Sequence, residues 1–129
     1  MAIASQDLRM ARVALAAEPP LLSHAVINAQ QCTEKALKAL LVLAGVTVKK
    51  IHDLAELAQQ TNTSHQGLNI DVSDAEWLTL LAGGHRYPGE PDEPLTLAIA
   101  AEAIALAGEV LDAALVRMPD DVQSRLRHS

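Results

Sequence analysis

The fold is decided by one stretch of the chain, VINAQQCTEKALKALLVLA, which covers residues 26–44. Its apolar residues recur every three or four positions, the spacing that puts side chains on one face of an α-helix. That face consists of Val26, Ala29, Thr33, Ala36, Leu40 and Leu43, widened by Leu37, Leu41 and Ala44. The spacing predicts a helix from Leu22 to Ala44 that ends at Gly45. Its second half is apolar almost all round, which predicts a position at the centre of a bundle.

The composition of the whole chain agrees with this local pattern. Of its 129 residues 43 are Ala or Leu, whereas there is one Trp, one Tyr and no Phe. Ala and Leu are the best helix formers, and strands favour aromatic and β-branched residues. The composition therefore predicts an all-α fold and argues against a β-sandwich or barrel. It also argues against a track of stacked nucleic-acid bases, which needs several rings.

Glycines and prolines divide the remainder into further helices. Pro19 and Pro20 end a first helix near Ala17, whose buried face is Ala4, Leu8, Ala11 and Leu15. A third helix is predicted to start at Lys50 or Ile51, to bury Ile51, Leu54, Ala55 and Ala58, and to end within 61–64. After a loop over 65–72, Ser73 and Glu76 have the spacing of a capping box for a short helix that contains Trp77 and ends at Gly83.

The last helix is predicted to begin at Pro94, after a non-helical segment that contains Pro88 and Pro91. Its contact face is Leu97, Ala101, Ile104, Gly108, Leu111 and Leu115. The prediction is thus a single domain over 1–129, with its core at about 5–116 and a polar tail over 118–129. It is an up-down antiparallel bundle of four long helices and one short helix.

Charge and cysteine content limit the possible partners and compartments. The formal net charge is −6, divided into +1 for residues 1–65 and −7 for residues 66–129. Broad electrostatic capture of nucleic acid needs a basic surface, so an anion site is expected in the first half or at Arg86. The single cysteine, Cys32, is predicted to be a packed small hydrophobe. Without an internal disulfide, a secretory signal or a membrane-spanning stretch, the expected location is the cytoplasm, with no membrane association.

Two groups of polar residues on the predicted helices are candidates for binding. His52 and Asp53 open the third helix, where they either favour the helix start or line a cleft that holds a phosphate or a carboxylate. Lys35 and Lys38 share one face with Glu34. Either Glu34 and Lys38 form an ordinary surface pair, or the two lysines bind an anion.

The segment His85-Arg86-Tyr87-Pro88 gathers an imidazole, a guanidinium and a phenol in one loop. Arginine recognises phosphate in a bidentate manner, so Arg86 either binds an anion or pairs with Glu90, Asp92 or Glu93 and holds the loop closed. The five histidines are not spaced as in zinc motifs, and neither a metal nor a cofactor is expected.

Three of these segments together resemble the HEPN-domain family. Residues 30–41, QQCTEKALKALL, resemble its QQAxEKALKALL helix. His52-Asp53-Leu54 resembles its HDL motif, and Arg86-Tyr87-Pro88 resembles its RYP motif. The order and spacing of the three blocks agree over residues 30–88, and the helix pattern extends the similarity to about 5–116.

The resemblance implies an all-α up-down bundle, commonly a homodimer, in a prokaryotic protein. Such proteins are partners of minimal nucleotidyltransferases, often as toxin–antitoxin pairs, or are nucleotide-binding accessory domains. Many are metal-independent ribonucleases that use Arg followed after four to six residues by His, completed across a dimer. No arginine of this chain is followed by a histidine at that spacing.

The resemblance therefore points to a binding module without catalysis, which takes a nucleotide, an RNA or a nucleotidyltransferase. The residues that match its motifs are Glu34, Lys35, Lys38, His52, Asp53, Arg86 and Tyr87. One alternative is a ribonuclease toxin with a non-standard site, in which His52 or His85 is the general base and Arg86 stabilises the phosphorane. Another is a purely structural helical adaptor.

Overall fold

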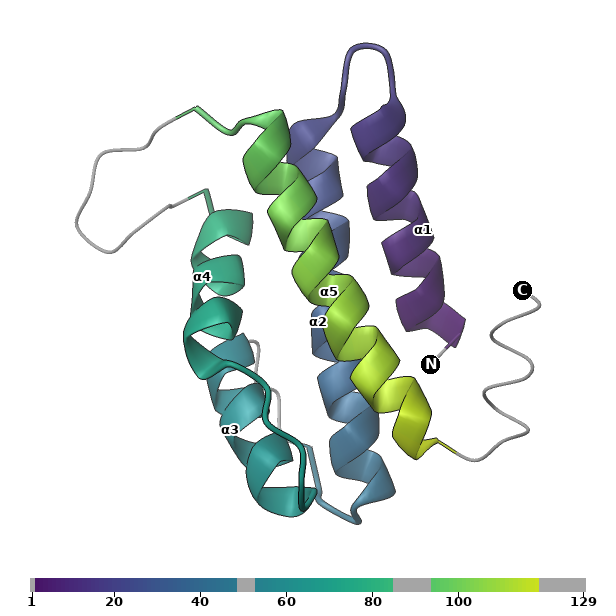
Figure 1. Cartoon of the computed structure of the whole chain (residues 1–129), viewed down its shortest axis with the longest axis vertical. Coiled ribbons are helices and arrows are strands. Elements are labelled where there is room, and N and C mark those ends of the chain that lie inside the picture. Colours follow the sequence, from purple (N-terminus) through teal and green to yellow (C-terminus); the bar gives the residue numbers. More distant parts are fainter. Residues whose placement is uncertain (1, 49–52, 85–93, 119–129) are drawn as a thin grey trace.

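The computed structural model describes residues 2–48, 53–84 and 94–118, whose regular secondary structure is entirely α-helical. The helices are α1 (Ala2–Ala16), α2 (Leu22–Leu43), α3 (Leu54–Ser64), α4 (Val72–Ala82) and α5 (Leu97–Arg117), which pack side by side as a bundle (Figure 1). The predicted all-α bundle is confirmed. Its proportions differ from the prediction, because α3 and α4 have 11 residues each and only the other three are long.

α2 is the central helix, as its sequence predicts, and it contacts each of the other four. Leu37, Leu40 and Leu41 are fully buried, whereas Leu43 is exposed at the end of the helix. Gly45 adopts a φ of 78°, and its N–H donates to the carbonyl of Val42 over 3.0 Å. This left-handed residue ends the helix at the predicted position.

Two kinds of packing surround α2. Its contacts with α1 and α5 are built largely from buried alanines, namely Ala4, Ala11, Ala14, Ala25, Ala29, Ala36, Ala100, Ala103, Ala107 and Ala114. Its C-terminal half meets the buried leucines of α3 and α4, which are Leu54, Leu57, Leu78 and Leu81. Small side chains let helix axes approach closely, which explains how the bundle packs with so few rings.

The buried faces of the outer helices differ in places from the predicted ones. In α1 Ala14 is buried together with the predicted Ala4, Leu8 and Ala11, whereas the predicted Leu15 is only partly buried. In α5 the predicted Leu97 and Ala101 are exposed, whereas Ala100 and Ala103 are buried. In both helices the contact face is turned slightly from the predicted one, and it uses alanines that allow close approach of the helix axes.

Side-chain caps set three helix starts at positions that differ from the predicted ones. Asp53 has an extended backbone and accepts from Ala55 N–H, so α3 begins at Leu54 and not at Lys50 or Ile51. Asp71 caps α4 by accepting from Asp74 N–H, a role predicted for Ser73. Thr96 caps α5 and displaces the predicted start at Pro94. In each case a side-chain oxygen satisfies an otherwise unpaired N–H of the first turn.

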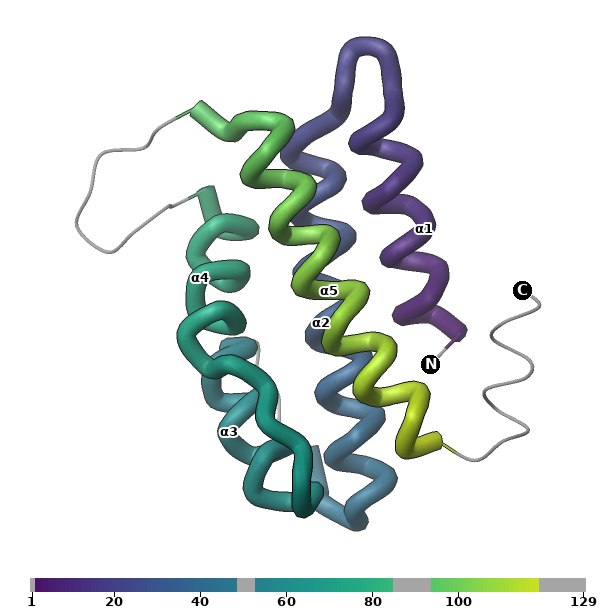
Figure 2. The backbone as a smooth tube through the Cα atoms, in the orientation of Figure 1, coloured from purple at the N-terminus to yellow at the C-terminus, as the bar shows by residue number. Residues whose placement is uncertain are grey.

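The helix directions alternate at every connection except one. α1 and α2 form an antiparallel hairpin, closed by Leu21 N–H donating to the Ala14 carbonyl over 2.9 Å. The end of α3 lies beside the end of α2, because His65 Nε2 donates to the Leu40 carbonyl over 2.6 Å. α3 therefore runs in the same direction as α2, and α4 returns beside it, as the tube in Figure 2 shows.

Candidate functional site

Lys35, the first of the predicted binding residues, connects two helices. Its Nζ lies 2.6 Å from Asp7 Oδ2 on α1, with side-chain exposures of 38% and 14%. The contact spans 28 positions of sequence, and the helical register of α2 alone gives no sign of it. The positive charge of Lys35 is thus largely compensated by a structural partner.

Lys38 and Glu34 form the pair that their spacing predicts. Lys38 Nζ lies 3.9 Å from Glu34 Oε2, one turn away on α2. This separation is at the outer limit of an ion pair, and such pairs along a helix contribute only a few tenths of a kcal/mol. The pair leaves Lys38 able to exchange its partner for an anionic ligand at little cost.

Asp53 performs the structural role that was one of its two interpretations. It is exposed, and its carboxylate accepts from Ala55 N–H over 2.9 Å at the start of α3. No hydrogen bond or ion pair of the described residues joins Asp53 to Lys35 or Lys38. The other predicted residues, His52, His85, Arg86 and Tyr87, lie outside the described residues.

Cys32 is fully buried on α2, as predicted for a packed small hydrophobe. Burial in an apolar environment raises the pKa of its thiol to about 12, and the nearby Asp7 carboxylate adds to the rise. The thiolate is the nucleophilic form of cysteine, so a thiol with this pKa is chemically inert at neutral pH.

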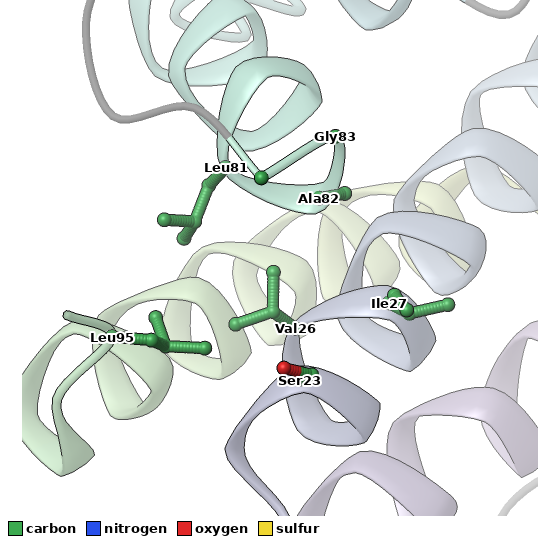
Figure 3. Close-up of a pocket in the computed structure, with 8 residues that line it drawn as sticks. Ser23, Val26, Ile27, Leu81, Ala82, Gly83 and Leu95 are labelled. Carbon is green, nitrogen blue, oxygen red and sulfur yellow. The ribbon is translucent and has the colours of Figure 1, made fainter. Parts of the chain in front are cut away.

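A cavity of about 320 Å³ lies where α2 begins, α4 ends and the chain enters α5 (Figure 3). Val26, Leu81 and Leu95 point toward one another across it, and the Ser23 hydroxyl lies beside them. Its rim includes Gly84, the chain neighbour of His85. The described residues thus provide an apolar hollow next in sequence to the His-Arg-Tyr-Pro segment.

The start of α2 at this cavity has no side-chain cap. Its N-cap position is occupied by Leu21, which has no group that can accept a hydrogen bond from the first turn. Uncapped N–H groups and the positive end of the helix dipole favour anions. The cavity therefore combines an apolar wall with a weakly electropositive edge.

Comparison with known protein families identifies the family to which this chain belongs. The sequence model of the HEPN domain matches residues 1–118. The chain belongs to the HEPN family. Comparisons with curated proteins and with solved structures find no significant match.

Membership of the HEPN family confirms the resemblance carried by the three sequence blocks. It points to a nucleotide- or RNA-related module, and HEPN domains commonly dimerise. No helix in the described part of the chain is long and apolar enough to cross a membrane. Within the same residues, no group of three or more His, Cys, Asp or Glu side chains is arranged to hold a metal ion.

Several residues of this HEPN domain escape the sequence patterns. Asp7, the partner of Lys35, is one acid among the polar residues of α1, and only the packed hairpin brings the two together. Thr79 of α4 accepts from Leu54 N–H over 3.2 Å and fixes the start of α3. Ser23 is an unremarkable surface residue until α2, α4 and α5 meet around it. All three depend on tertiary contacts that periodicity does not encode.

Proposed function

We propose that this HEPN domain is a non-catalytic module that binds a nucleotide, and that it works with a minimal nucleotidyltransferase as one half of a toxin–antitoxin pair. One observation carries the proposal: the HEPN model covers residues 1–118 of a chain that lacks the Arg-to-His motif of the family's ribonucleases. Without that motif, the function of the domain is recognition of a ligand or partner.

The contacts of α2 support a particular division of labour among the candidate residues. Lys35 is held by Asp7 at 2.6 Å, so in this proposal it mainly fixes α1 against α2. Lys38, with its loose 3.9 Å pair, is the lysine that contacts an anion. Arg86 and Tyr87, which follow in sequence the Gly84 that lines the cavity, supply the phosphate contact and a single stacking ring in this proposal. His52, Asp53 and Glu34 complete the proposed site.

Calorimetric titration with ATP and AMP tests nucleotide binding by the full chain. We expect binding that weakens at least tenfold in Arg86→Ala, because a bidentate guanidinium–phosphate contact is lost. Arg12→Ala on α1 is the matched control, since it removes the same charge from an exposed position and leaves binding unchanged. Absence of binding, or equal losses in the two variants, would contradict the nucleotide proposal.

Copurification with a minimal nucleotidyltransferase tests the proposed partner. An RNA-cleavage assay without metal ions tests the alternative, a ribonuclease. Cleavage that is lost in His52→Ala or His85→Ala would establish a ribonuclease and overturn the non-catalytic proposal. If no nucleotide and no nucleotidyltransferase binds, the structural adaptor becomes the better description.

The proposed module is a homodimer that uses α1 and α5. Three large hydrophobic residues of α1, Ile3, Met10 and Val13, are more than half exposed and share its outward side. α5 adds Leu97 and Val116, which are exposed as well. The exposed apolar residues of α1, gathered on one side of that helix, are typical of a protein contact.

Size-exclusion chromatography with light scattering tests this interface. Met10→Glu together with Val13→Glu is expected to convert the dimer to a monomer, because it buries two carboxylates at the contact. Val42→Glu, at another exposed position on α2, is the control and leaves the dimer intact. A monomeric native protein, or an equal effect of the control, would show that α1 is not the interface.

A further inference from the structure

The surface between α4 and α5 contains a continuous groove that is separate from every described residue of the proposed nucleotide site. Its upper part is a cavity of about 470 Å³ lined by Asp74, Trp77, Glu102, Ala105, Leu106 and Glu109. Its lower part, of about 370 Å³, runs along residues 67–71 to Arg117. Asp74, Leu106 and Glu109 line both parts, so the two cavities form one groove.

The floor and the rim of this groove differ in chemistry. Leu106 and Val110 of α5 form an apolar floor together with Ile70, and the indole of Trp77 is partly buried beside it. Asp74, Glu102 and Glu109 form the rim. An apolar floor inside a charged rim is the usual construction of a protein-docking groove.

The three rim carboxylates form no ion pair in the described structure, although Arg117, which donates to the Ala113 carbonyl, lines the far end of the lower part. The ion pairs found there are Lys35 with Asp7 and Lys38 with Glu34, both at the α1 and α2 side of the bundle. Asp74 contributes only its backbone N–H, to the cap of α4. The upper part is lined by these three carboxylates and by no cation, so the like charges repel each other there, and a cationic occupant removes that repulsion.

The spacing of the carboxylates indicates the shape of the occupant. Glu102 and Glu109 are seven residues apart on one side of α5, which places them two turns, or about 10 Å, from each other. Leu106 lies between them. A helix with cationic side chains seven residues apart and an apolar residue between presents the complementary pattern.

We propose that this groove docks a basic amphipathic helix of another protein, with its cations on Glu102 and Glu109 and an apolar side chain on Trp77 and Leu106. A nucleic acid is excluded because its phosphates meet three carboxylates. A second copy of this chain fits poorly, because the lysines of its α2 are already paired with Asp7 and Glu34, and the arginines of its α1 are three residues apart and not seven. The proposal is independent of nucleotide binding, since the groove shares no lining residue with the cavity at the start of α2 and includes none of Glu34, Lys35, Lys38 and Asp53.

Trp77 makes the groove directly observable, because it is the only tryptophan of the chain. The probe is a synthetic helical peptide of about 14 residues, with lysines seven residues apart and leucines between them. At low ionic strength we expect a saturable blue shift of Trp77 emission. The double variant Glu102→Gln/Glu109→Gln is expected to weaken peptide binding about tenfold, because both charge contacts are lost.

The matched control is Glu18→Gln/Glu56→Gln, which removes the same charge from exposed positions away from the groove. It leaves peptide affinity within about twofold of native. Equal weakening in the control would overturn the proposal, because peptide binding would then follow the net negative charge of the protein. An equal emission change with spermidine would also overturn it, because any small cation would then occupy the groove.

Two further measurements distinguish a helix of another protein from two other possible occupants of the groove, the chain's own C-terminal segment and a second copy of the chain. Native affinity in Arg125→Gln/Arg127→Gln supports docking in trans, whereas a gain in peptide affinity would assign the groove to the chain's own C-terminal segment. An unchanged oligomeric state in Glu102→Gln/Glu109→Gln supports a different protein as partner. A changed state would assign the groove to a second copy, and a titration without any emission change would overturn the proposal outright.

Discussion

The contact between α1 and α2 and the groove between α4 and α5 use similar residues for opposite purposes. In the first, Asp7 pairs with Lys35, and buried alanines close the space between the helices. In the second, Asp74, Glu102 and Glu109 lie around Trp77 and form no ion pair with another described residue. The difference shows that the sequence pattern of a polar helix face does not determine whether a charged residue on it forms an ion pair or lines an open groove. The role of such a residue depends on what the neighbouring helix brings opposite it.

The largest expected difference between the closed and the open region is in packing. Leu37→Ala, at a fully buried position of α2, is expected to lower the free energy of unfolding by about 2–5 kcal/mol, because it leaves a cavity. Leu106→Ala, in the partly exposed floor of the groove, is expected to cost less, about 1–2 kcal/mol, because its side chain is only partly buried and its removal leaves a space open to water. Urea denaturation followed by circular dichroism measures both.

Similar costs for the two substitutions would contradict this distinction, because they would show the groove to be packed as tightly as the core. Leu80→Ala serves as a further control on α4, at another partly buried position. Its cost is expected to resemble that of Leu106→Ala.

The same comparison explains how much of the molecule the sequence could reveal. Periodicity predicted the central position of α2 and its end at Gly45, because burial and left-handed backbone are local properties of that segment. It predicted the wrong cap for α4, because Ser73 and Asp71 are both good caps and only the tertiary structure selects between them. Glu34, Lys35 and Lys38 were identified as one polar face, but the pairing of Lys35 with Asp7 needs the folded hairpin.

Cys32 provides the second test of the closed region, through pH. Burial raises its pKa from 9.0 to about 12, so above pH 9 the unfolded chain loses the thiol proton first. The stability that the buried thiol contributes is complete below pH 9 and is lost between pH 9 and about 12, by about 1.4 kcal/mol per pH unit. Relative to Cys32→Ala, the native protein is expected to lose about 2 kcal/mol between pH 8 and 10.5.

Urea denaturation of both proteins at the two pH values measures this difference. If the native protein and Cys32→Ala lose stability in parallel, the thiol is not desolvated and the contact between α1 and α2 is more open than described. Thiol labelling at pH 8, slow in the native state and fast in urea, gives an independent check.

The two ion pairs of α2 provide a smaller test. It asks whether the distance between the charges and the helices that they join decide how much each pair contributes to the free energy of unfolding. Lys35→Met keeps the apolar stem and is expected to cost about 0.5–1 kcal/mol, because the 2.6 Å pair joins two helices. Lys38→Met is expected to cost about 0.2–0.5 kcal/mol, since the 3.9 Å pair lies within one helix. Double-mutant cycles with Asp7→Asn and Glu34→Gln measure the two coupling energies, and equal values would remove the distinction.

The smallest expected effect concerns the groove, where removal of charge should stabilise the protein. Glu102→Gln/Glu109→Gln is expected to raise the free energy of unfolding by about 0.3 kcal/mol, because it relieves repulsion around Asp74 at an exposed, well-screened surface. Glu18→Gln/Glu56→Gln removes the same charge elsewhere and separates this local effect from the net charge of −6. The gain is expected to vanish at about 1 M salt, where the screening length falls to about 3 Å. A loss of stability in the groove variant would mean that the two glutamates already have cationic partners. The groove and the contact between α1 and α2 would then both contain paired charges, and they would differ only in how closely their helices pack.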